Sequence, residues 1–84
     1  EDTVAMRRAI VALDRHGIEP RHLRAMRASA ERDVALIESS LSTLLRRQDA
    51  GSRAKANELA PELARRLDDV RHAFVASALM RIFP

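Results

Sequence analysis

The chain of 84 residues contains no cysteine. This absence excludes disulfide bonds, thiol nucleophiles and zinc sites with cysteine ligands. Its three histidines, His16, His22 and His72, form no metal-binding motif such as H-E-x-x-H. We therefore expect no metal ion and no cofactor.

Aromatic residues are almost missing as well, since the chain has no tryptophan, no tyrosine and two phenylalanines. This excludes an aromatic platform on which single-stranded nucleic acid could stack. No apolar run approaches the about 18 residues that a membrane span requires, and no signal peptide is visible. We expect a cytoplasmic protein without membrane contact.

Charge of one sign does not dominate any part of the chain. The formal net charge is +3, from 15 basic and 12 acidic residues, and the acids are dispersed among the bases. Because the acids are dispersed, the excess of basic residues is only weak evidence for a nucleic-acid partner. The serines lie in helical or capping contexts, without the turn that exposes a serine nucleophile. We expect no catalysis.

Glycine and proline are scarce, with two and three residues respectively, and this favours long helices. Apolar residues recur at helical spacing over residues 3–16, and Gly17 is placed to end that helix in the left-handed conformation. Glu19-Pro20 predicts a new helix start, because proline is tolerated at the first helical position. No glycine or proline occurs from Arg21 to Gln48, so a second helix over residues 21–48 is expected to run unbroken for about 28 residues, or ~42 Å.

The only later turn is predicted at residues 49–52, after which Ser52 can cap a third helix. Pro61 lies inside this helix, where it removes one hydrogen bond and crowds the carbonyl of Asn57. We expect a kink there, or a new helix starting near Ala60. The predicted fold class is all-α: a short N-terminal helix followed by a long antiparallel helical hairpin, in one helical domain over residues 1–84.

An apolar stripe follows one face of the second and third predicted helices in steps of three and four residues. It can be the inner face of the hairpin or a homodimer seam, and these readings do not exclude each other. A small chain without disulfides or metals buries too little surface to be stable alone, so we expect a homodimer, with the interface helix undetermined. The residues of this predicted seam are Leu23, Met26, Ala30, Val34, Ile37, Leu41, Leu44, Leu63, Leu67, Val70 and Phe74.

A second candidate site is the basic cluster at the start of the second predicted helix. Arg21, His22 and Arg24, with the free N–H groups of the helix end, could hold an anion or an effector. The alternative is a solvated face with local ion pairs such as Arg27–Glu31. The solvated face is the favoured interpretation.

The run HGIEPRHLR, residues 16–24, resembles the segment that follows the winged-helix DNA-binding domain in actinobacterial MerR-family transcriptional regulators of the FtsR-like type. The resemblance continues weakly through Glu62-Leu63-Ala64 and His72. It implies that the chain is the C-terminal dimerisation and effector domain of a longer regulator. The parent protein would bind promoter DNA through an N-terminal winged helix absent from this chain, and would control cell-division genes. The effector is unknown.

Two alternatives remain open. The hairpin could be an interaction module that docks another protein, such as RNA polymerase or a cell-division component. It could also be an all-helical enzyme of the chorismate mutase type, in which several arginines hold a dicarboxylate transition state. No helix offers an inward set of arginine, lysine and glutamate on its apolar face, so the non-catalytic regulatory domain is the preferred hypothesis.

Overall fold

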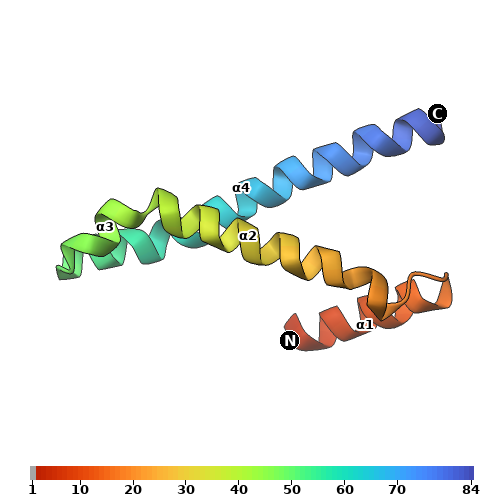
Figure 1. Ribbon diagram of the computed structural model, residues 1–84, viewed down its shortest axis with the longest axis horizontal. Coiled ribbons are helices and arrows are strands. Elements are labelled where there is room, and N and C mark those ends of the chain that lie inside the picture. Colours follow the sequence, from red (N-terminus) through yellow and green to blue (C-terminus); the bar gives the residue numbers. More distant parts are fainter. Residues whose placement is uncertain (1) are drawn as a thin grey trace. The chain divides into compact units, whose positions relative to one another are not determined.

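Helices form almost all of the computed structural model, which describes residues 2–84. In chain order these are α1 (Asp2–Arg15), the short 3-10 helix η1 (Pro20–Leu23), α2 (Arg24–Ser40), α3 (Ser42–Arg47) and α4 (Ala50–Ile82) (Figure 1). The described part of the chain contains no strand. The predicted all-α fold class is therefore confirmed.

The chain divides into two compact units. The first ends at Glu31 and contains α1, η1 and the beginning of α2. The second comprises Arg32–Pro84 and contains the rest of α2, together with α3 and α4. Helix α2 thus supplies residues to both units.

Helix α1 ends in a Schellman motif around Gly17. The backbone N–H of Gly17 donates to the carbonyl of Asp14 at 3.1 Å, and that of Ile18 donates to the carbonyl of Leu13 at 3.0 Å. Gly17 has φ +88°, in the left-handed region that residues with a Cβ rarely adopt. The predicted end of the first helix is confirmed.

The chain becomes helical again at Pro20, as the sequence predicts. Glu19 is extended, with φ −84° and ψ 161°, and is the N-cap of η1. Its backbone N–H donates to Nδ1 of His22 at 2.9 Å, and the N–H of His22 donates to the carbonyl of Glu19 at 2.9 Å. Three residues of the run HGIEPRHLR therefore fix the geometry of this helix start.

The prediction of an unbroken second helix over residues 21–48 is wrong. Residues 20–23 are a 3-10 helix, and Leu41 separates α2 from α3 with φ −98° and ψ 7°. The hydroxyl of Ser40 donates to the carbonyl of Ile37 at 2.9 Å. A serine hydroxyl that bonds to the preceding turn competes with the helical backbone bonds. This bond directly precedes Leu41, where the helix is interrupted.

The turn between α3 and α4 is closed by Asp49, and not by Ser52 as predicted. Gln48 adopts the left-handed conformation, and Asp49 is the N-cap of α4. A carboxylate oxygen of Asp49 accepts a hydrogen bond from the backbone N–H of Ser52 at 2.7 Å, and the other accepts from its hydroxyl at 3.0 Å. Aspartate caps as well as serine does, so the helix starts at Ala50, with Ser52 in its first turn.

Helix α4 runs through Pro61 without interruption, so the expectation of a new helix near Ala60 is wrong. Pro61 has no N–H to donate to the carbonyl of Asn57. Both residues are exposed, so water can hydrate this carbonyl. The kink at Pro61 stays a prediction.

Helix α3 packs against the beginning of α4, where the hairpin closes (Figure 1). Three described residues are buried in the chain: Leu41 and Ala56, with exposed fractions of 7% and 3%, and the polar Ser52 with 7%. All three lie near this end of the hairpin. The core of the described chain is therefore very small and lies in the second unit.

The cap of α4 predicts a pH dependence of stability. The pKa of Asp49 is lowered from its ordinary value of 3.8, first by the hydrogen bond from the backbone N–H of Ser52 and then by that from its hydroxyl. Because the folded pKa is depressed, this stabilisation is present above the ordinary value and is lost as the pH falls through the folded pKa. Asn at position 49 keeps an acceptor but does not titrate.

We therefore expect Asp49→Asn to lose less stability than the wild type as the pH falls from above the ordinary pKa of 3.8 through the lowered pKa of the folded state. The midpoint of urea unfolding, followed by circular dichroism, measures this difference. The other carboxylates titrate in both proteins, so their effect cancels. Equal losses in the two proteins would contradict the role assigned to Asp49.

Candidate functional site

The predicted seam is only partly covered within the chain. Leu41 is buried. The half-buried members are Leu23, Ile37, Leu44, Leu63 and Leu67, and the exposed members are Met26, Ala30, Val34, Val70 and Phe74. The packing of the hairpin therefore covers the middle of the predicted seam. Most seam residues on either side of this middle part are exposed to solvent.

A shallow apolar groove of about 240 Å³ lies in the second unit, between α2 and α4. Leucine, isoleucine and valine side chains dominate it, and Arg66 is the one charged residue of its lining. Its lining residues are Leu36, Ile37, Ser40, Leu63, Arg66, Leu67 and Val70. Leu36 and Val70 are 62% and 49% exposed, so the chain itself leaves this groove open.

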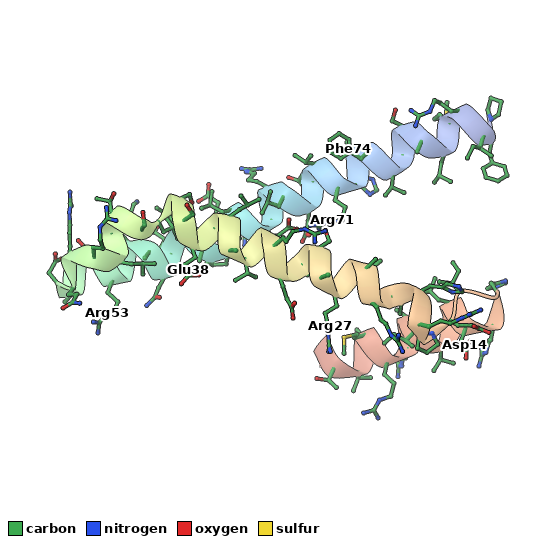
Figure 2. The ribbon with its side chains drawn as sticks, in the orientation of Figure 1. Asp14, Arg27, Glu38, Arg53, Arg71 and Phe74 are labelled. Carbon is green, nitrogen blue, oxygen red and sulfur yellow. The ribbon has the colours of Figure 1, made fainter. Side chains whose placement is uncertain are left out.

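Beyond the groove, α4 continues as an apolar helix without a covering element in its unit. From Phe74 to Phe83 the only charged residue is Arg81. Phe74, Ile82 and Phe83 are 72%, 69% and 73% exposed, and Figure 2 shows the ring of Phe74 standing out from α4. A helix that is apolar on several sides is normally buried. This segment therefore needs a cover from outside the second unit.

Arg71 of α4 forms a polar clamp at the edge of the groove. Its guanidinium donates to the carboxylate of Asp33 on α2, and at 2.6 Å to that of Asp68 one turn earlier on α4. Figure 2 shows Arg71 directed toward α2. Asp33 is 24% exposed, so this pair is better shielded from water than the other ion pairs of the described chain.

Sequence reasoning missed this clamp, although a signal was present. Asp33 lies four residues before Ile37, and Arg71 lies four residues after Leu67. Both charges therefore interrupt the apolar face of their own helix. Opposite charges at matching positions on two apolar faces indicate a pair across the hairpin.

Two of the three residues predicted to hold an anion form hydrogen bonds with Glu19. Nε of Arg21 donates to a carboxylate oxygen of Glu19 at 2.6 Å. His22 accepts the N–H of Glu19 through Nδ1, and Arg24 is exposed in the first turn of α2. Two of the three thus serve the helix start, and anion binding by this cluster stays a prediction.

Over residues 3–84, no three acidic or histidine side chains lie close enough together to hold a metal ion. Within the same range, no helix combines the length and the apolar character that crossing a membrane requires.

Comparison with known proteins gives consistent matches. The model of the Rv1828-like, C-terminal domain family matches residues 1–83. Two relatives are each 35% identical over 79 residues: the uncharacterized HTH-type transcriptional regulators Rv1828 of Mycobacterium tuberculosis and Mb1859 of Mycobacterium bovis. The match covers 94% of this chain and 32% of each relative, so the chain spans about a third of the length of these curated relatives. No solved structure matches it.

The clamp between Asp33 and Arg71 predicts a measurable coupling. We expect a double-mutant cycle with Asp33→Ala and Arg71→Ala to give a coupling energy of about 0.5–1 kcal/mol, decreasing as salt is added. Thermal unfolding by circular dichroism measures it. The exposed pair Lys55–Glu58, with nitrogen and oxygen 3.6 Å apart, is the matched control and should couple less. Equal coupling of the two pairs would remove any special role for the clamp.

Proposed function

This chain belongs to the Rv1828-like, C-terminal domain family, and on this premise we propose that it is the dimerisation and regulatory domain of a MerR-family DNA-binding transcriptional regulator. The relatives named HTH-type transcriptional regulators support a role in transcription and give no support for catalysis. Assignment to the MerR family, and to the control of cell-division genes, rests on the resemblance carried by residues 16–24. Promoter DNA is read by a part of the regulator outside this chain.

The observation that carries the proposal is the mismatch between apolar surface and core. Within the second unit only Leu41, Ser52 and Ala56 are buried. Large apolar side chains of the same unit are 49–73% exposed, among them Leu36, Val70, Phe74, Val75, Leu79, Met80, Ile82 and Phe83. This apolar surface is available for an interface with a partner.

A second copy of the chain is the occupant that we propose for this surface. The groove and the apolar end of α4 lie on the same unit, and the exposed side chain of Val70 continues from one to the other. In a two-fold interface each copy presents the same patch, so the groove of one copy can receive apolar side chains of the other. A single two-fold interface then covers the groove and the apolar end of α4 in both copies.

Such a dimer contributes to DNA binding through geometry. It fixes the separation and angle of two attached DNA-reading heads, so that the second half-site of a palindrome is bound at a high effective concentration. The domain then raises promoter affinity without contacting a base.

We expect the 84-residue chain to sediment as a dimer at micromolar concentrations, with twice the mass of the 9.4 kDa chain. Phe74→Asp should yield a folded monomer, because a carboxylate would be buried without a partner in the interface. Ala76→Asp is the matched control: it adds the same charge to the same helix two residues away, about 200° around the axis, and should remain dimeric. Equilibrium sedimentation measures the mass, and circular dichroism verifies helicity.

A wild-type monomer at high micromolar concentration would exclude the dimer. It would favour the interaction module, in which a heterologous helix covers the same groove.

A fusion tests the regulatory consequence. The chain is joined to a monomeric helix-turn-helix head, and binding is compared on one half-site and on a palindrome of two. We expect the fusion to prefer the palindrome, and the Phe74→Asp fusion to lose this preference while its half-site affinity is unchanged. A wild-type fusion that binds both DNAs alike would contradict the proposed coupling.

A further inference from the structure

Helix α1 carries a basic groove that the proposed dimer does not use. Its lining consists of two valines and three arginines, and its volume is about 410 Å³. Four of these residues follow one face of α1 at helical spacing and the fifth flanks them: Val4, Arg8, Val11 and Arg15, with Arg7 beside them. The groove lies entirely within the first unit.

Within the described residues, no acidic side chain forms an ion pair with the three arginines. In the part of the chain that the structure describes, ion pairs involve Arg21, Lys55, Arg66 and Arg71, and none involves Arg7, Arg8 or Arg15. Asp14, the acid near the end of α1, does not line the groove. The groove therefore presents three positive charges to solvent.

A small molecule fits this surface poorly. Ligand pockets bury most of a bound molecule, whereas this groove lies along a single helix and its valines are 51% and 46% exposed. An extended anion is the better match. The arginine stems can lie along the valines, which leaves the guanidinium groups free to reach outward.

Duplex DNA has the required charge density. From Val4 to Arg15 the helix rises by about 16 Å, and B-DNA carries one phosphate charge per about 1.7 Å of its axis. About ten phosphates therefore lie along this length of duplex, enough for three arginines to reach one each. Arginine also binds phosphate in two-pronged geometry.

We propose that Arg7, Arg8 and Arg15 contact DNA phosphates beside the site that the regulator reads, so that this domain adds a sequence-independent share of the affinity. The inference rests on the proposed function, because membership in a DNA-binding regulator brings the domain close to a duplex. Helix α1 is the first helix of a domain described as C-terminal, so we infer that the DNA-reading part precedes it.

The test uses the 84-residue chain and a fluorescently labelled DNA duplex of arbitrary sequence. Binding is followed by fluorescence anisotropy at several salt concentrations. Each phosphate contact contributes about 0.9 to the slope of log affinity against log salt. The triple variant Arg7→Gln, Arg8→Gln, Arg15→Gln should therefore lower that slope by about 2.7. Glutamine keeps helix propensity close to that of arginine, and circular dichroism verifies that α1 is retained.

A matched variant removes the same charge elsewhere. Arg53, Arg65 and Arg81 are exposed on α4 and make no ion pair in the described chain. Their replacement by glutamine should leave the slope nearly unchanged. If both triple variants lower the slope equally, only net charge matters and the proposal is overturned. An oligoglutamate peptide that binds the groove as tightly as DNA at equal salt would overturn it in favour of an acidic protein partner.

Sedimentation of the same samples separates this inference from the proposed function. A dimer whose salt slope ignores the α1 arginines would refute the phosphate contacts alone. A monomer whose slope still falls by about 2.7 would support the contacts while refuting the dimer.

Discussion

The packing of α3 against the beginning of α4 is the contact on which the second unit depends. Leu41 and Ala56 are buried there, and the cap between Asp49 and Ser52 fixes the turn that joins the two helices. No comparable apolar core occurs elsewhere in the described residues. Stability is therefore concentrated at one end of the hairpin, and the clamp between Asp33 and Arg71 adds a single charged contact farther along α4.

Because the buried core is small and lies at one end of the hairpin, the stability of the second unit depends on association with a partner. The apolar part of α4 beyond Phe74 has no cover within its unit, and the groove beside Leu67 is open. A partner that binds only the folded hairpin stabilises it in proportion to the logarithm of the partner concentration. For a second copy as partner, stability and oligomeric state become one equilibrium.

The basic residues differ in whether an acidic side chain pairs with them. Arg71 pairs with Asp33 and Asp68, and Arg21 pairs with Glu19. Neighbouring carboxylates therefore compensate both positive charges. Ion pairs near the surface contribute little to stability but restrict the direction of the side chain. The arginines of α1 have no such partner among the described residues, and their charge is directed to solvent. The net charge of +3 does not show which arginines are paired and which are not.

The sequence by itself determined the helical class and the helix ends that depend on the conformational limits of single residues. Gly17 ends α1 and Pro20 begins η1, because the left-handed conformation and the fixed φ of proline are properties of single residues. The interruption at Leu41 depends on whether the hydroxyl of Ser40 donates to water or to the carbonyl of Ile37. The spacing of apolar residues in the sequence does not show which of the two occurs.

Only the tertiary structure decided how the apolar stripe divides between hairpin and open surface, since that depends on how closely α2 and α4 approach. The same holds for the clamp of Asp33 and Arg71, which are 38 residues apart in sequence. The α1 groove lies between these cases. Its helical spacing is visible in the sequence, but the absence of ion pairs on its arginines becomes known only when the neighbouring acids are placed in space.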